Sequence, residues 1–361
     1  MKALRRRALF ALAAVTIAFT IPFVTLLAAD VYLHRKYEKS AGFNIWGYRG
    51  PVAPRKKAGE YRVVVLGGSA AYGYGVNWDE AMPAGLERRL EGRQPDPIRS
   101  FKVINLGYNN EGAFSFKYTL RDYLWLNYDL ACLYEGYNDL MGDPRGPNLS
   151  VFRHTSPVFR LTGYLPIFPM IFREKAGLIL HGGDVDALYR ELQARDGPKT
   201  VFRPGLAAKT AAGVLTATAD IGQSLERQLG RVAAEPRHEI TDVAATLCKS
   251  PWEQYCRSVL VAVEFAVQHD KQVLVVTQPY GAGPIFRARH SEQQREMAAM
   301  LARRFGNDPR VKYVNLGDQV SLEDPALSFD QMHLTVAGNA RLAAGLVEPV
   351  LEMAARRTRQ W

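Results

Sequence analysis

Residues 63–75 read VVVLGGSAAYGYG, a short apolar and β-branched run followed directly by glycines and other small residues. Such a run is typical of a buried strand, and the glycines after it indicate a tight turn. Ser69 lies in this turn, where the two preceding glycines let the backbone approach a ligand closely. Open α/β sheets bind ligands at the carboxyl ends of parallel strands. The stretch predicts either a serine that faces a ligand or a serine that only caps the next helix.

The rest of the chain continues an alternation of strands and helices. Further strands are expected at residues 101–106, 129–134, 272–277 and 311–316. Helices are expected at residues 79–90, 116–126, 252–269, 291–305 and 336–357. Strands that alternate with helices of this length predict an α/β fold, in which a doubly wound and mostly parallel sheet is covered by helices on both faces in three layers.

An apolar run without charge covers residues 8–29 and follows Lys2 and Arg5–Arg7. About 20 apolar residues are enough to span a bilayer as a helix, and the run is longer than the apolar core of a usual signal peptide. Leu27-Ala28-Ala29 offers small residues that would still allow cleavage. We expect an uncleaved, single-pass signal anchor over residues 1–30, with the remainder of the chain on the exported, periplasmic or extracellular side.

The segments after the anchor differ in character. Residues 31–60 are polar, aromatic and interrupted by Pro and Gly, and are expected to form a stalk. Residues 61–361 are expected to form the catalytic domain, with a long insertion at about 141–249 after the third strand. Within the insertion, the apolar stretch 164–172 contains two prolines and is not expected to span a membrane. It could form a lid, contact lipid or pack on the core.

The chain of 361 residues carries a formal net charge of +10. Such a charge would suit nucleic acid, an anionic membrane surface or an acidic glycan. Basic residues cluster at the two ends, at residues 5–7 and 356–359, and are otherwise mostly dispersed, and no nucleic-acid-binding motif is present. We therefore expect no nucleic-acid partner, and the sequence does not indicate an oligomeric state.

The sequence contains three cysteines. Cys132 lies in an apolar strand-like run, which is typical of a buried and inert thiol. Cys248 and Cys256 are separated by a short stretch that contains Pro251. They could form a disulfide in an oxidising compartment or remain two free thiols.

Four turns at predicted strand ends, or directly before the last helix, carry side chains suited to catalysis. They contain Ser69, the glycines Gly107 and Gly112, Asn138, and Asp330 with His333. Carboxyl ends of parallel strands meet at one edge of a sheet, so these residues are expected to lie together. A serine becomes a nucleophile when a base such as His333 removes its proton, and Asp330 could orient that base.

The same four turns leave other interpretations. An Asp-x-x-His segment such as Asp330 to His333 also occurs where helices begin, and it could contribute to a metal site. No further His, Cys or Asp cluster lies at ligand spacing, so we expect neither a metal nor a cofactor. The glycine-rich turn at residues 67–75 is not followed by the lysine of a phosphate-binding loop, which argues against nucleotide binding.

The sequence resembles the SGNH (GDSL-type) hydrolases in four blocks. These are Gly67-Gly68-Ser69, Asn105-Leu106-Gly107 with Gly112, Gly136-Tyr137-Asn138-Asp139 and Asp330-Gln331-Met332-His333. The resemblance covers roughly residues 61–139 and 272–355, and leaves out the N-terminus and the insertion. It implies a flavodoxin-like three-layer fold.

The resemblance also implies a role for each matching residue. Ser69 would be the nucleophile, His333 the base and Asp330 the third member of a triad. The side-chain amide of Asn138 and the backbone N–H of Ser69 would bind the oxyanion, together with the N–H of a glycine in the second block. That glycine is Gly112 or, as the alternative, Gly107.

Two features depart from the family pattern. The usual Gly-Asp-Ser is Gly67-Gly68-Ser69 here, which removes a carboxylate beside the nucleophile but no member of the triad. The second block is about one residue longer than expected between Asn105 and Gly112, and this affects the choice between Gly107 and Gly112.

These features favour a membrane-anchored serine esterase that forms an acyl-enzyme at Ser69. The expected partners are the membrane, through the N-terminal helix, and an ester-bearing substrate with O-acyl or acetyl groups on an envelope glycan or lipid. An O-acyltransferase of an envelope polysaccharide would use the same triad. A catalytically silent binding module of the same fold is a further alternative, although such a module need not keep Ser69, Asn138, Asp330 and His333.

Overall fold

The computed structural model describes residues 2–40, 42–134, 136–140, 153–184, 188, 203–232 and 248–358. These form two compact units. One unit comprises Met1–Lys36 with Tyr164–Ala234, and the other comprises Tyr37–Gly163 with Glu235–Trp361.

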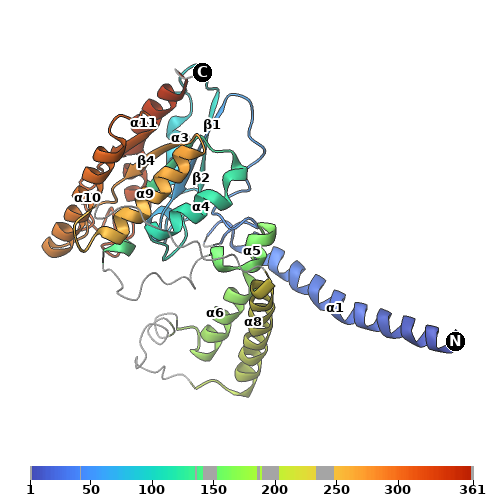
Figure 1. Cartoon of the computed structure of the whole chain (residues 1–361). Helices are drawn as coiled ribbons and strands as arrows, with labels where there is room; N and C mark the ends of the chain where they lie inside the picture. The colour runs from blue at the N-terminus through green and yellow to red at the C-terminus, as the bar shows by residue number, and fades with distance from the viewer. Residues whose placement is uncertain are drawn as a thin grey trace. The chain divides into compact units, whose positions relative to one another are not determined.

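The larger unit contains a five-stranded, all-parallel sheet in the order β2-β1-β3-β4-β5 (Figure 1). Its strands are β1 (Glu60–Leu66), β2 (Ser100–Asn105), β3 (Leu130–Tyr134), β4 (Gln272–Val276) and β5 (Val311–Val314). Every residue of β1, β3 and β4 is buried, as expected for continuous apolar runs in a parallel sheet with both faces covered. The predicted doubly wound α/β fold is confirmed, and the strand order reverses between β1 and β3.

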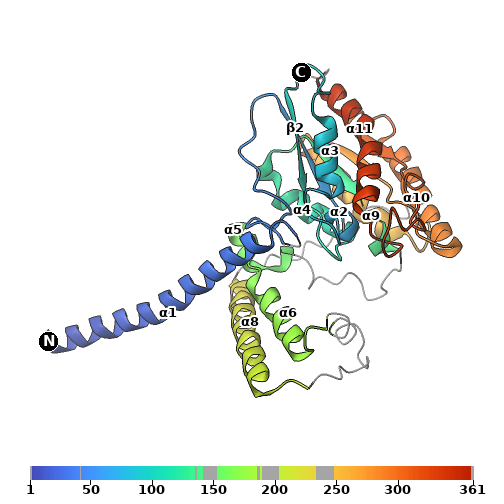
Figure 2. The ribbon, with the colours of Figure 1, turned by 180° about the vertical axis from the view of Figure 1, so that it is seen from behind.

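Helices cover both faces of this sheet. On one face α3 (Met82–Leu90) packs against α11 (Val336–Thr358), and the two lie side by side in Figure 2. On the other face α4 (Phe116–Asp122) packs against α9 (Glu253–Gln268), and α10 (Pro284–Phe305) contacts α9 and β5. Alternate strand residues share one core with α3 and α11; this core includes Val63, Val65, Leu130, Cys132, Leu274, Leu86 and Leu346.

Short elements complete the larger unit. They are α2 (Ser69–Tyr72), η1 (Ala113–Ser115), η2 (Leu124–Leu126), η3 (Tyr137–Asp139), η5 (Arg153–Thr155) and α5 (Pro157–Thr162). Cys248 and Cys256 form a disulfide at the start of α9. Cys132 is a free thiol, and burial raises its pKa to about 12, so it is chemically inert at neutral pH.

Some helix boundaries differ from the sequence-based expectation because of proline. The helix expected from residue 79 begins at Met82, since Pro83 occupies the first turn and Ala81 is extended. The helix expected from residue 291 begins earlier, at Pro284, after Gly283 with a φ of 74°. Proline at a helix start fixes a helical φ and has no N–H to leave unpaired.

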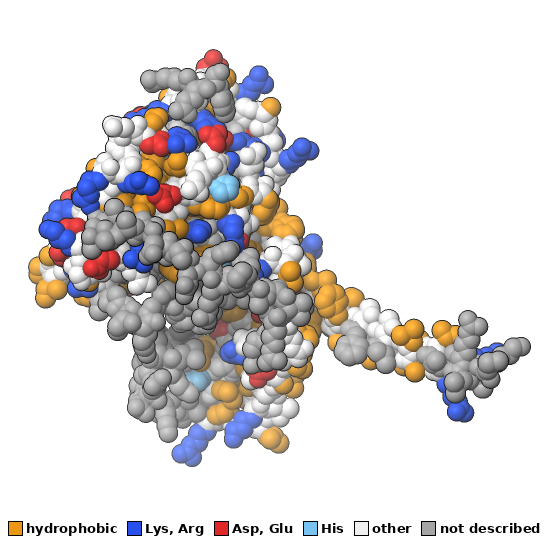
Figure 3. Space-filling model, in the orientation of Figure 1, with side chains coloured by type: hydrophobic (Ala, Val, Ile, Leu, Met, Phe, Trp, Pro, Cys, Tyr) orange, Lys and Arg blue, Asp and Glu red, His pale blue; other side chains and the backbone are white. Residues whose placement is uncertain are grey.

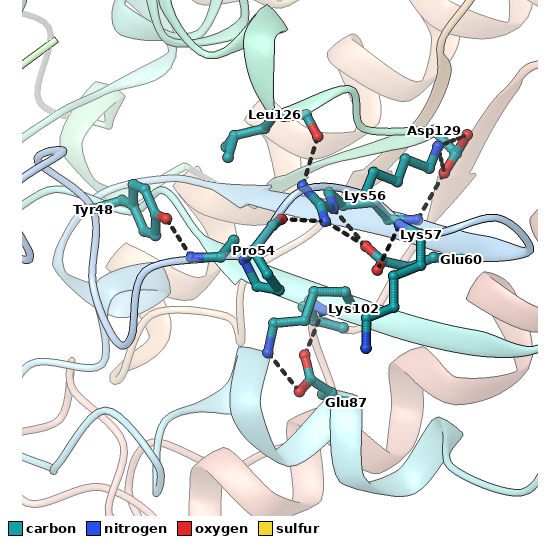
Figure 4. Close-up of polar contacts among 12 residues, drawn as sticks. Tyr48, Pro54, Lys56, Lys57, Glu60, Glu87, Lys102, Leu126 and Asp129 are labelled. Carbon is teal, nitrogen blue, oxygen red and sulfur yellow. Dashed lines mark hydrogen bonds and ion pairs between the residues drawn. The ribbon is translucent and has the colours of Figure 1, made fainter.

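The amino-terminal edge of the sheet is held by buried and half-buried ionic contacts (Figure 4). Arg62 is 2% exposed, and its guanidinium donates to Glu60 at 2.7 Å, to the Leu126 carbonyl at 2.8 Å and to the Pro54 carbonyl at 2.9 Å. Lys56 donates to both oxygens of Asp129 at 2.6–2.7 Å. Every one of these groups has a partner, and the cluster lies at the strand starts, so we assign it a structural role.

The smaller unit contains α1 (Lys2–Tyr37), α6 (Phe168–Leu180) and α8 (Leu206–Val232). Within the described part of the chain, α1 is the one helix long and apolar enough to cross a membrane, with a mean hydropathy of 2.3 over its most apolar window. Apolar side chains of α1 are exposed to solvent (Figure 3). The helix continues past the apolar run to Tyr37.

The end of this apolar run contacts the insertion. Asp30 of α1 is 1% exposed and accepts hydrogen bonds from the backbone N–H groups of Ile167 at 2.8 Å and Phe168 at 2.6 Å. It therefore supplies the side-chain cap that α6 itself lacks. The stretch at residues 164–172, which includes Pro169 in the first turn of α6, leads into this helix and packs beside α8, where a Cβ on Gly222 would lie 2.6 Å from the Phe168 ring.

Candidate active site

The turn that carries Ser69 requires a glycine directly after β1. Gly67 has a φ of +154°, and a Cβ at this position would lie 2.0 Å from the carbonyl oxygen of Tyr134 in β3. Only glycine fits such a close approach of two backbones. The chain therefore turns tightly against the neighbouring strand, and Ser69 becomes the first residue of α2 at the carboxyl end of β1.

Two polar side chains hold the end of α2. Arg49 is 3% exposed, donates to the carbonyl of Gly73 at 2.6 Å and also to that of Tyr72. Asn105 donates its amide to the same Tyr72 carbonyl at 3.1 Å. The last turn of a helix leaves carbonyl groups without partners, so these donors satisfy them and fix the position of Ser69.

His333 lies within hydrogen-bond distance of Ser69, although 264 residues separate the two in sequence. Its Nε2 is 2.8 Å from the Ser69 hydroxyl oxygen, and its Nδ1 is 2.6 Å from Oδ2 of Asp330. Oδ1 of Asp330 accepts the backbone N–H groups of Met332 at 3.0 Å and His333 at 2.6 Å. The structure thus brings together the three residues that the sequence suggested as a triad.

The charge state of Asp330 suits the orientation of an imidazole. Partial burial would raise the pKa of this carboxyl, but hydrogen bonds from the side chain and backbone of His333, its charge and the Met332 N–H together lower it. Asp330 is therefore ionised at neutral pH and accepts the Nδ1–H of His333. The opposite nitrogen, Nε2, is then free of hydrogen and can accept the Ser69 proton.

The second and third predicted turns contact each other and the Ser69 turn. The amide of Asn138 donates to the Glu111 carbonyl at 2.8 Å, and the Tyr108 N–H donates to the Gly67 carbonyl at 2.9 Å. Asp139 accepts the Ala113 N–H at 2.9 Å. Burial raises the pKa of Asp139 to about 6, although the Ala113 N–H acts to lower it. These contacts join the loops after β1, β2 and β3.

The two candidate glycines of the second turn differ in whether their backbone N–H already donates a hydrogen bond within the protein. The Gly107 N–H donates to the Asn105 side chain at 2.9 Å, and a Cβ there would lie 2.5 Å from the Tyr72 nitrogen. Gly107 is therefore a packing residue against α2. In the described part of the chain, the Gly112 N–H donates to no other group. This difference favours Gly112 as an oxyanion donor.

Sequence reasoning missed a buried polar network beneath the loop of Glu111 and Gly112. Arg153 is 1% exposed, lies 3.8 Å from the Glu111 carboxylate and donates to the Leu106 carbonyl at 2.7 Å. Its neighbour His154 contacts Asp122 at 2.7 Å. Arg153 lies in the predicted insertion and Arg49 in the predicted stalk, and neither belongs to a motif that would have indicated a role near the site.

The comparisons with known proteins give matches among solved structures alone. No family profile matches the sequence, and no curated protein matches it. A member of the lipolytic protein G-D-S-L family from Veillonella parvula is 10% identical, with a TM-score of 0.39 over 80% of this chain and 97% of that chain. TesA is 12% identical, with a TM-score of 0.41 over 81% and 99% of the two chains. An acetylxylan esterase from Geobacillus stearothermophilus is 11% identical, with a TM-score of 0.39 over 80% of this chain and 94% of that chain.

Two of these three similar structures are named as a lipolytic protein and an acetylxylan esterase. At these identities and scores, function has to be inferred from the site of this chain itself. Across the described residues, no group of three or more His, Cys, Asp and Glu side chains is placed to hold a metal ion.

Proposed function

We propose that the protein is a membrane-anchored serine esterase with Ser69 as nucleophile, His333 as general base and Asp330 as the residue that orients it. The continuous line of hydrogen bonds from the Ser69 hydroxyl through His333 to Asp330, at 2.8 and 2.6 Å, supports this proposal. A serine hydroxyl is a poor nucleophile unless a base within hydrogen-bond distance removes its proton. The arrangement provides that base at the carboxyl edge of a parallel sheet.

The proposed reaction proceeds in two halves. Nε2 of His333 accepts the Ser69 proton as Oγ attacks the ester carbonyl, and Asp330 stabilises the imidazolium that forms. The backbone N–H groups of Ser69 and Gly112 and the amide of Asn138 then donate to the oxyanion. His333 protonates the leaving alcohol, and a water activated by the same imidazole releases the acid from the acyl-enzyme.

The proposed location is the outer face of a membrane. The apolar window of α1 is 0% buried and needs an apolar environment. The Cys248–Cys256 disulfide is typical of an oxidising compartment. Both features support an exported catalytic domain that acts on O-acyl groups of an envelope glycan or lipid. The anchor is tested by washing membrane fractions with alkaline carbonate. Release of the chain from the membrane, or a chain shortened at its N-terminus, would contradict an uncleaved anchor.

The catalytic proposal is tested with the full chain in detergent micelles. We expect a fluorophosphonate probe to label the wild type and not Ser69→Ala. The control variant Ser291→Ala, which replaces a half-buried serine that accepts a hydrogen bond from Arg295, should be labelled like the wild type. Hydrolysis of 4-nitrophenyl acetate is expected to follow the same pattern. Absence of labelling in a folded wild type, or equal labelling of Ser69→Ala, would contradict the proposal.

The same experiment distinguishes hydrolysis from acyl transfer. Both reactions pass through an acyl-enzyme at Ser69 and differ in whether water or an alcohol resolves it. When a sugar alcohol is added in excess, free acetate as the sole product supports an esterase. Acetylated sugar detected by mass spectrometry would indicate a transferase.

A further inference from the structure

Two half-exposed aromatic side chains lie against the imidazole of His333. The Tyr74 ring centroid is 4.7 Å from that of His333 at an interplanar angle of 44°. The Phe329 ring is nearly parallel to the imidazole, at 5.9 Å and 19°. The two residues are 47% and 50% exposed. Single apolar side chains are common on protein surfaces, but two rings that meet at one polar site indicate a binding surface.

The backbone places both rings beside the base. Tyr74 lies between Gly73 and Gly75, which have φ values of 81° and 85° in the left-handed region. A Cβ at Gly75 would lie 2.5 Å from Cζ of Phe329, so the missing side chain leaves room for this ring. The Phe329 N–H donates to the His333 carbonyl at 3.2 Å, which joins its backbone to the turn of the base.

The proposed chemistry determines which half of an ester these rings would contact. His333 returns its proton to the leaving alcohol, so the leaving oxygen must come within hydrogen-bond distance of Nε2. The acyl carbonyl oxygen must instead face the donors of Ser69 and Asn138. The group attached to the leaving oxygen therefore lies beside His333, next to Tyr74 and Phe329.

We propose that Tyr74 and Phe329 form a binding subsite for the alcohol half of the ester, and that this subsite takes a pyranose ring bearing the acyl group. The inference rests on the proposed esterase function. A pyranose has a face of C–H groups that packs on flat aromatic rings, while its hydroxyl groups remain in water at a half-exposed site. The Tyr74 hydroxyl has no hydrogen-bond partner among the described residues and can bond a sugar hydroxyl.

The test varies each half of the ester separately, with the full chain in detergent micelles. The substrates are an acetylated methyl xyloside, the matching butyrate and hexyl acetate, a linear ester. The variants are Phe329→Ala, Tyr74→Ala and Phe329→Tyr, which retains a ring. Trp125→Ala serves as the matched control, because Trp125 is 53% exposed and packs against Trp46 and Tyr123.

We expect Phe329→Ala to raise KM for both xyloside esters about tenfold, with kcat changed less than about threefold, because tenfold corresponds to about 1.4 kcal/mol, which is within the range of one aromatic contact. For hexyl acetate, the KM of Phe329→Ala is expected to differ from that of the wild type by less than about threefold. Tyr74→Ala should behave similarly, and Phe329→Tyr should resemble the wild type.

Two results would overturn the subsite. If the alanine variants lost the same factor in kcat/KM for the xyloside esters and for hexyl acetate, the rings would only position His333. If KM were unchanged in both alanine variants, the rings would not touch the alcohol. Failure of the esterase function itself looks different: the wild type would hydrolyse none of the three esters, and the fluorophosphonate probe would not label Ser69.

Discussion

Replacing Asp330 with asparagine would separate two tasks that its carboxylate performs. Oδ1 accepts the N–H groups of Met332 and His333, and Oδ2 accepts Nδ1 of the His333 ring. Asparagine retains one oxygen, which can keep both backbone hydrogen bonds. Its amide nitrogen would then donate to Nδ1 and hold the hydrogen of the imidazole on Nε2. That tautomer cannot accept the Ser69 proton.

The expected loss follows from this change of tautomer. In a serine protease triad, the equivalent substitution lowers kcat by about 10⁴-fold, which corresponds to about 5 kcal/mol of activation free energy. We expect a similar loss for Asp330→Asn. The thermal midpoint should change little, because the two backbone hydrogen bonds to Oδ1 remain and the side chain is 39% exposed. Asp330→Ala should lose these hydrogen bonds as well and should unfold at a lower temperature.

The assay compares kcat for 4-nitrophenyl acetate, fluorophosphonate labelling and the thermal midpoint across the variants. Asp324→Asn is the matched control, because Asp324 accepts the Ala326 N–H at 2.9 Å in a preceding turn, and no described hydrogen bond joins it to His333. The control should retain wild-type activity. If a folded Asp330→Asn variant stayed within about tenfold of the wild type, Asp330 would not set the tautomer of His333.

Three further predictions concern other parts of the structure. Asn138→Ala should lower kcat for aryl acetates by about 10²–10³, the loss typical of one oxyanion donor, and a smaller effect would place Asn138 outside the oxyanion site. Burial lowers the pKa of His290 to about 4, below its unfolded value of about 6.5. The unfolded chain therefore binds the extra proton first, and stability should fall by about 3 kcal/mol as pH decreases from about 6.5 to 4. The thermal midpoint of His290→Phe should lack this slope, and an unchanged slope would assign it to other groups. The disulfide closes a loop with a sequence separation of 8. Replacing Cys248 and Cys256 with alanine should cost about 2–3 kcal/mol in urea unfolding, and an unchanged midpoint would show that the pair does not stabilise the fold.

The sheet could be predicted from local sequence because its strands are short, apolar and separated by helices. The run Val63 to Leu66 is typical of a buried strand, and the glycines directly after it indicate a tight turn. The beginnings of α3 and α10 were harder to locate, because Pro83 and Pro284 can either end one segment or begin the next helix. The helices α5, α6 and α8, which the structure describes within the insertion, were not expected, since the sequence of the insertion lacks a strand–helix rhythm.

The choice between two similar residues required the structure. The sequence favours Gly112 as the oxyanion donor with Gly107 as the alternative, and only the structure shows that the Gly107 N–H is already bonded to the Asn105 side chain. The contributions of Arg49 and Arg153 depend on backbone carbonyls far away in the chain. Periodicity and motif spacing carry no information about such contacts.

The sequence by itself determined the α/β class, the apolar N-terminal run and the residues able to act as nucleophile, base and orienting carboxylate, because strand patterns, apolar length and side-chain chemistry are local properties. The tertiary structure alone decided the 2.8 Å approach of Ser69 to His333, the placement of Tyr74 and Phe329 against the imidazole, and the Asp30 cap on α6. Apart from the contact of Phe329 with His333, which lies within one turn, these contacts join segments distant in the chain. They form because the strand ends converge at one edge of the sheet and because the fold buries polar groups that must each find a partner.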